Sequence, residues 1–196
     1  MMRAYRPDVL VRLCRTLLPD DPSLAEELAL ASRDPSAYYS RFRQRLQNER
    51  GIEPNQSDFP DLPWVAMLDG LRYREHLAEI DWRAPAELVM EEVDKLLHDP
   101  GTAALRWDWV DAEYADSISI AELLHAIGRR LFTQSQMFAQ VYEVSDTLPT
   151  MIINPDRLPE LQSLARLSGY GDIQPLDSRL TGDFHLPWLT DKPGAP

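Results

Sequence analysis

The chain has a single cysteine, Cys14, and this scarcity limits both its covalent and its metal chemistry. One thiol cannot close a disulfide within the chain, so we expect a protein of a reducing compartment, the cytoplasm. The four histidines are scattered and lack the paired spacing of a zinc site. We therefore expect no metal and no other cofactor. Because Cys14 lies on the apolar stripe of its helix, its thiol should be buried and unreactive.

Long apolar runs and catalytic motifs are also missing. No uninterrupted stretch approaches the roughly 18 residues of a membrane-spanning helix, and no apolar segment of an export signal follows the charged N-terminus. We expect no membrane association. The sequence contains neither G-x-S-x-G nor a Ser-x-x-Lys set, the marks of common serine nucleophiles. Whether the protein is an enzyme stays uncertain, and we lean toward a protein without catalytic activity.

The negative charge is concentrated in the middle of the chain. Of a net charge of −12, residues 51–116 contribute −11, from 5 basic and 16 acidic side chains. Such a field disfavours nucleic acid as a ligand and favours a basic protein partner, although solubility explains it equally well. Arginines beside aromatic residues, Arg41, Arg43 and Arg45, are too few to bind nucleic acid well at physiological salt. We expect them to pair with the acidic middle third.

Three successive helix patterns predict a helical N-terminal subdomain over residues 1–50. The first runs from Asp8 to Leu18, with apolar residues recurring at one-turn spacing. The next two each begin at an Asp-Pro pair, at positions 21–22 and 34–35, where aspartate is an N-cap and proline takes the first helical position. Residues 51–60 read as a loop and predict a boundary.

Residues 51–176 predict an α+β body organised around the stretch from Met137 to Leu176. This stretch reads as strand, tight turn, strand, helix and strand, with the helix opened at Asn154-Pro155 and ended at Gly169. An alternating pattern at 76–82 predicts a further strand. The fold class is therefore α+β, a helical N-terminal part followed by a small mixed β-sheet flanked by helices. The tail, 177–196, should dock or fray.

Two features of the body bear on individual elements. Ser119 and Glu122 have the spacing of a capping box, which predicts a helix from Ser119 to Leu131. Residues 105–116 contain an alternation of large apolar and polar side chains, which predicts a short strand or an extended loop.

Two segments carry motifs of a known kind. Between Trp64 and Trp82 a helix is followed by Leu-Ala-Glu-Ile-Asp-Trp. From Tyr142 to Ile173 the order is Tyr-x-Val, then Met-Ile-Ile-Asn-Pro, then a Leu-rich helix ending in Ser-Gly-Tyr. The chain resembles, in these segments, a bacterial family known only as a domain of unknown function. The resemblance implies an α+β domain and a bacterial cytoplasmic protein, and it implies no site residues.

An acidic segment with two tryptophans is the candidate binding site, formed by Trp107, Asp108, Trp109, Asp111, Glu113 and Asp116. Aromatic anchors within a charged rim are typical of interface hot spots. We therefore favour an acidic protein–protein interaction module of the inhibitor or immunity type, with a basic protein partner. The sequence does not decide its oligomeric state. Burial of both tryptophans in the core would remove this argument. The segment lacks the glycine and the terminal glutamate of an EF-hand. We therefore interpret these carboxylates as a solvated acidic loop rather than as metal ligands.

Two alternatives remain open. The first is a small-ligand-binding protein or an enzyme with an unrecognised site, for which convergent polar groups such as His76, Asp108 and His125 would have to meet in a pocket. The second is mimicry of nucleic acid, which requires the acidic side chains to follow one continuous ridge. The positions of these side chains in the fold separate the hypotheses.

Overall fold

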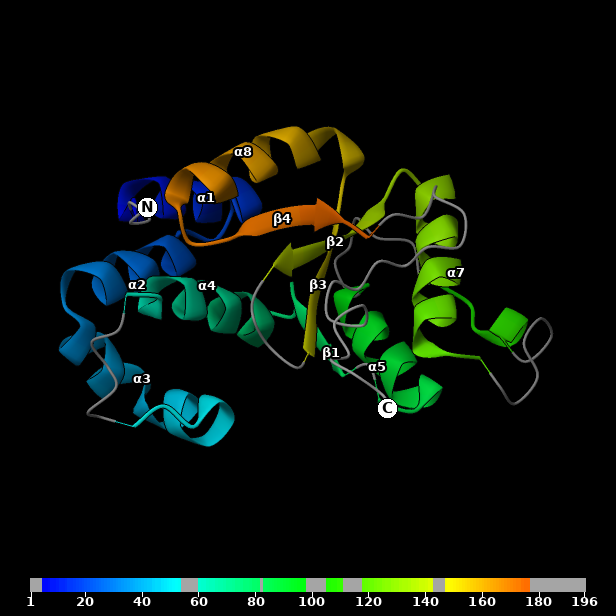
Figure 1. Cartoon of the computed structure of the whole chain (residues 1–196), viewed down its shortest axis with the longest axis horizontal. Helices are drawn as coiled ribbons and strands as arrows, with labels where there is room; N and C mark the ends of the chain where they lie inside the picture. The colour runs from blue at the N-terminus through cyan, green and yellow to red at the C-terminus, as the bar shows by residue number, and fades with distance from the viewer. Residues whose placement is uncertain are drawn as a thin grey trace, which may run out of the picture.

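A small β-sheet lies between two layers of helices in the computed structural model of the chain (Figure 1). The structure describes residues 5–53, 60–81, 83–97, 105–110, 118–142 and 147–176. The α+β class with helices first is confirmed. Within the described part of the chain, no helix is long and apolar enough to span a bilayer.

The first four helices are α1 (Pro7–Leu17), α2 (Pro22–Arg33), α3 (Pro35–Arg50) and α4 (Leu62–Tyr73). Their starts follow the predicted chemistry. The Asp21 carboxylate accepts a hydrogen bond from the Ser23 backbone N–H at 2.9 Å, and Asp34 accepts one from Ala37 at 2.9 Å. In each helix the aspartate accepts a bond from one of the backbone N–H groups that a helix start leaves without a partner, and the proline removes another such group because it has no N–H.

The four strands are β1 (Ala78–Asp81), β2 (Met137–Tyr142), β3 (Thr147–Ile153) and β4 (Asp172–Pro175), in the spatial order β1-β3-β2-β4. Every pairing is antiparallel, so the sheet carries none of the parallel pairs that a mixed sheet would have. The predicted β2–β3 hairpin forms, and β4 is the edge strand that its proline predicts.

The remaining helices are α5 (Ala86–Leu96), α7 (Ile120–Thr133), the 3₁₀ turn η2 (Pro155–Arg157) and α8 (Leu158–Ser168). The capping box that starts α7 is present in both directions between Ser119 and Glu122. The prediction of a strand or extended loop over residues 105–116 is wrong for Asp108 to Val110, which are helical, with the Val110 N–H bonded to the Trp107 carbonyl at 2.9 Å; residues 111–116 lie outside the described residues.

Both faces of the sheet are buried because helices cover each of them, and alternate residues of a strand enter opposite cores. Ala139 and Val141 of β2 pack into the core of α1–α4 and α8, whereas Phe138 packs into the core of α5 and α7. The first core thus joins helices of residues 1–50 to the sheet. The division into 1–50 and 51–176 stays a prediction, and the tail 177–196 lies outside the described residues.

Arginines of α3 are used inside the molecule. Arg45 donates to Glu27 and to the Tyr38 hydroxyl, both at 2.9 Å, and burial raises the pKa of Tyr38 to about 12. Arg50 pairs with Asp69 of α4 and Glu79 of β1. The predicted pairing with the acidic middle third is therefore wrong for Arg45, whose carboxylate partner is Glu27 of α2. Arg50, which that prediction did not include, does reach the middle third.

Candidate functional site

Helices α4 and α7 end in the same backbone turn. At the end of α4, the N–H of His76 bonds to the carbonyl of Leu71 at 2.9 Å, and the N–H of Glu75 bonds to that of Arg72 at 3.0 Å. The end of α7 repeats both bonds at 3.0 and 3.1 Å, from Gln136 to Leu131 and from Ser135 to Phe132. This pair of bonds is a Schellman motif, which requires a left-handed residue directly after the helix cap.

Glutamate and serine occupy that left-handed position, with φ of 59° at Glu75 and 58° at Ser135. Glycine is the usual residue there, because a Cβ in this conformation costs about 1–2 kcal/mol. Helices α3 and α8 follow the rule with Gly51 and Gly169. Among the described residues, Glu75 and Ser135 are the two non-glycine positions with positive φ. Such strain is a reason to look for function at these two helix ends.

The sheet topology brings the two turns together. β3 lies between β1 and β2 and runs antiparallel to both, with Ile153 opposite Met137 and Thr150 opposite Ala78. The end of β3 is therefore flanked by the starts of its two neighbours. Since His76 and Gln136 directly follow the two turns and lead into β1 and β2, they lie on either side of that strand end.

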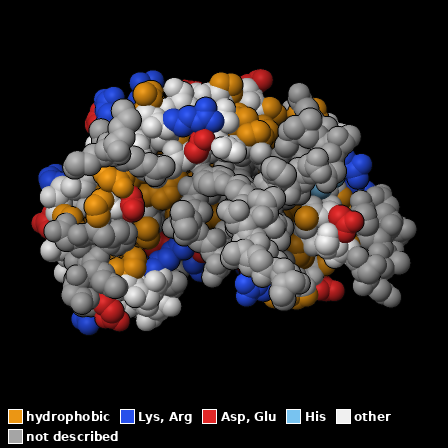
Figure 2. All heavy atoms as spheres, viewed as in Figure 1, with side chains coloured by type: hydrophobic (Ala, Val, Ile, Leu, Met, Phe, Trp, Pro, Cys, Tyr) orange, Lys and Arg blue, Asp and Glu red, His pale blue; other side chains and the backbone are white. Residues whose placement is uncertain are grey.

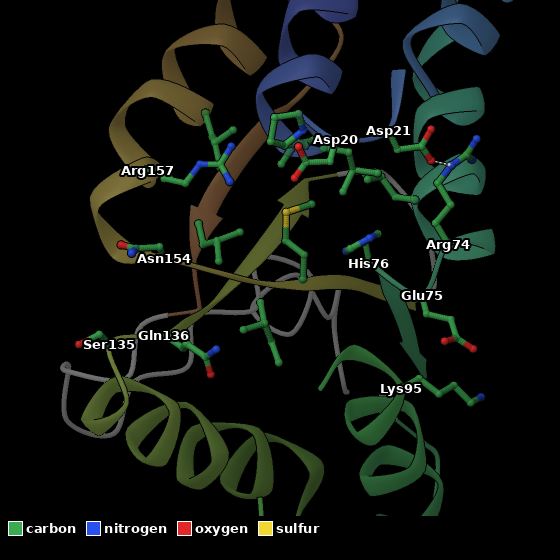
Figure 3. A pocket seen from close by; sticks show the side chains of 18 of the residues that line it. Asp20, Asp21, Arg74, Glu75, His76, Lys95, Ser135, Gln136, Asn154 and Arg157 are labelled. Carbon is green, nitrogen blue, oxygen red and sulfur yellow. Dashed lines mark hydrogen bonds and ion pairs between the residues drawn. The ribbon is translucent and has the colours of Figure 1, made fainter. Parts of the chain in front are cut away.

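A pocket of about 830 Å³ occupies this place, and we call it the helix-end pocket. Its walls come from segments that are far apart in the sequence: 17–21, 74–76, 134–136, 151–154 and 157, with Leu71, Lys95 and Leu161. Figure 3 shows side chains from these segments converging around the opening. Both strained residues line the pocket.

One wall of the pocket is fixed by Arg74. Its guanidinium donates to Asp21 and Glu27, each at 2.6 Å, so it ties the end of α4 to the start of α2 (Figure 3). Hydrogen bonds from Ser23 and Arg74 lower the pKa of Asp21 to about 2. The Arg74 head group, with 15% of its side chain exposed, is therefore engaged in structure rather than open to the pocket.

Some other polar groups of the lining have no hydrogen-bond partner among the described residues. The side-chain oxygen of Gln136 is buried and accepts no hydrogen bond. A buried acceptor without a donor costs about 1–3 kcal/mol, so this oxygen is suited to a donor brought by a ligand. Within the described residues, the side chains of His76, Arg157 and Asp20 make no hydrogen bond or ion pair with one another or with their neighbours.

The tryptophans of the sequence-predicted site are partly buried and have internal contacts. The Trp107 indole N–H donates to both carboxylate oxygens of Asp94 on α5, at 3.0 Å. The Arg130 guanidinium of α7 lies 3.5 Å from the centre of a Trp109 ring. Asp108 lies between them with 69% of its side chain exposed and pairs with Arg106 at 3.4 Å. The two indoles thus attach this segment to α5 and α7.

The other members of the predicted site, Asp111, Glu113 and Asp116, lie outside the described residues. Binding at this segment stays a prediction. Among the residues that are described, no group of three or more histidine, cysteine or acidic side chains could hold a metal ion. On the face shown in Figure 2, the acidic side chains of the described residues lie singly among basic and apolar ones. That scatter forms no ridge on this face.

Of the three residues expected to converge in a pocket, only His76 lines this one. Asp108 pairs with Arg106, and His125 lies half-buried in the middle of α7. Sequence reasoning missed Gln136, Ser135 and Arg157. A weak signal was present: α4 and α7 each end shortly before a strand with no glycine or asparagine at the helix end, so a left-handed cap there has to use another residue.

Comparison with known proteins gives a family and no activity. No curated protein and no solved structure matches the chain significantly. A family described as a domain of unknown function, DUF6630, matches residues 9–176, which covers the whole sheet and the helices of the described part except the first two residues of α1. This is more of the chain than the two segments that carry the resemblance in the sequence. The chain therefore belongs to the DUF6630 family.

Proposed function

We propose that this protein binds a small polar ligand in the helix-end pocket. The observation that carries the proposal is the coincidence of the two strained residues, Glu75 and Ser135, in the lining of one pocket. At each position glycine would relieve the strain, so the retained side chain has a use other than folding. A volume of about 830 Å³ is within the usual range of small-molecule sites.

The composition of the walls supports a polar ligand with an apolar part. Met151 and Leu161 are buried at the pocket floor, and Leu17, Leu18 and Ile153 are half-buried beside them. A few open polar groups stand among these apolar side chains. This mixture is typical of ligand sites, where apolar walls give affinity and a few polar groups fix orientation.

The test is protein-observed NMR with a mixed library of amino acids, carboxylates, sugars, nucleotides and polyamines. We expect at least one compound to shift the backbone amides of residues 134–136 and 151–154. Changes confined to other regions, or none for any compound, would overturn the proposal. The Glu75→Gly/Ser135→Gly double variant should bind less tightly even though its fold is relieved of strain. Weaker binding by a more stable protein cannot be ascribed to unfolding.

A protein partner for the acidic segment is a second proposal. Its support is Asp108, which is exposed between two half-buried indoles in the most acidic part of the sequence. Because Trp107 and Trp109 also make internal contacts, alanine at either position would confound binding with stability. Asp108→Lys is the better variant. A basic partner should be retained by the wild type, and both added salt and Asp108→Lys should release it; retention insensitive to both would contradict the proposal.

A further inference from the structure

The charged residues of the helix-end pocket divide into those already paired and those left open. Arg74 is held by Asp21 and Glu27, and Lys95 pairs with Glu92. Asp20 and Arg157 are different, since neither makes an ion pair with a described residue. One is anionic and the other cationic, so the pocket offers a charge of each sign.

These two residues come from different segments of the lining. Asp20 belongs to the loop between α1 and α2, and Arg157 is the last residue of η2, directly before α8. Figure 3 shows the Arg157 guanidinium and the Asp20 carboxylate turned toward one another at the same side of the pocket. Their charged atoms are nonetheless further apart than the 4.0 Å of an ion pair. Because the two do not pair with one another, both charges are left for a ligand.

We infer that the ligand is a zwitterion with a carboxylate and an ammonium group, an amino acid or a short peptide. This inference rests on the proposed function of the pocket. The ligand carboxylate pairs with Arg157, whose planar guanidinium suits bidentate binding of a carboxylate. The ammonium group pairs with Asp20. No covalent step is involved.

The rest of the pocket selects among zwitterions. Beyond the charged pair, the ligand passes over the apolar floor at Met151 and reaches the starts of β1 and β2. The buried oxygen of Gln136 needs a donor, which a side-chain amide or hydroxyl, or a peptide N–H, supplies. His76 stands on the other side of β3 and offers a second hydrogen bond. A zwitterion with an additional N–H or O–H group is therefore preferred.

The experiment is a calorimetric titration of the intact chain with glutamine, serine, alanyl-alanine and alanyl-glutamine. The free amino acids and the dipeptides separate the two sources of the same chemistry. The ligand that binds most tightly is then titrated in two derivatives. Its N-acetylated form lacks the ammonium charge, and its C-terminal amide lacks the carboxylate charge. We expect each loss of charge to weaken binding about tenfold or more, the usual effect of a charge-assisted hydrogen bond.

Matched variants locate the two charges. Arg157→Gln should weaken binding of the zwitterion about tenfold and leave binding of the C-terminal amide unaffected. Asp20→Asn should also weaken binding of the zwitterion about tenfold, and it should leave binding of the N-acetylated form unaffected. Arg12→Gln and Asp8→Asn, at exposed positions of α1 outside the pocket, are the controls and should bind like the wild type.

The outcomes separate this inference from the proposed function. If no zwitterion binds but another compound shifts the lining amides, the inference fails and the ligand-binding function stands. If zwitterions bind equally well to Arg157→Gln and Asp20→Asn, the inference fails as well. If no compound of any class reaches the pocket, both fail.

Discussion

Replacing Glu75 or Ser135 by glycine should stabilise the protein. Both side chains are exposed, so their removal loses little packing. A non-glycine residue in the left-handed conformation costs about 1–2 kcal/mol. Glycine costs about 0.5–1 kcal/mol in additional conformational entropy on folding. The difference is a gain of about 0.5–1 kcal/mol in the free energy of unfolding at each position.

Urea unfolding measures this gain. The midpoint should rise while the slope m stays unchanged, since the surface exposed on unfolding is nearly the same. For a chain of 196 residues, 1 kcal/mol corresponds to a rise in Tm of about 2–4 °C.

Gly51 provides a matched control at the end of α3. Its φ is 63°, and a Cβ added there would meet no atom within 4 Å. Gly51→Ser therefore adds the strain of Ser135 without a steric clash, and it should lower stability by about as much as Ser135→Gly raises it. If Gly51→Ser destabilises as expected but neither Glu75→Gly nor Ser135→Gly stabilises, those side chains support the fold. The argument from strain to function would then be refuted.

Three further predictions concern other parts of the structure. Gly171→Ala should lower the free energy of unfolding by about 1–3 kcal/mol, because its Cβ would lie 2.4 Å from the Trp64 ring, and an unchanged urea midpoint would contradict this contact. The pKa of Asp21 is lowered to about 2 by Ser23 and Arg74, so its stabilisation is present above its ordinary value of 3.8 and is lost as pH falls toward 2. The difference in urea midpoint between wild type and Asp21→Asn should therefore narrow from about pH 5 to pH 2; a constant difference would exclude the charged form as its source. Burial raises the pKa of the Cys14 thiol, so mass spectrometry should find iodoacetamide labelling only after unfolding, and labelling of the native protein would show that α1 opens.

Local chemistry made much of the fold predictable from the sequence. Asp21-Pro22 and Asp34-Pro35 start helices because the carboxylate caps the first turn. Proline suits the next position because it has no backbone N–H that would be left without a partner. The β2–β3 hairpin connects neighbours in the sequence, so its pairing needed no long-range information. Gly169 ends α8 in the left-handed conformation that glycine favours.

The helix-end pocket was not predictable in the same way. It depends on β1 pairing with β3, across nearly seventy residues, and on the α1–α2 loop lying over the end of that strand. The hydrophobic periodicity of a sequence indicates local structure and does not indicate which distant segments pair. Glycine does not mark the ends of α4 and α7, because Glu75 and Ser135 take the left-handed position that glycine usually occupies. The alternation of apolar and polar residues in the tryptophan segment predicts an extended chain, whereas Leu105 and Val110 are buried beside a helical turn.

The two departures from the glycine rule are more informative together than either is alone. One strained helix end is a common irregularity, and one substitution to glycine would relieve it. Here the same Schellman turn, with the same departure, occurs on both sides of β3 and opens into one pocket. In a Schellman motif the residue after the left-handed one is frequently hydrophobic and packs back on the helix. Here that residue is polar in both turns, His76 in one and Gln136 in the other. Because local rules of folding are broken most often where function requires it, two matching violations that converge on one place favour a binding site there over chance.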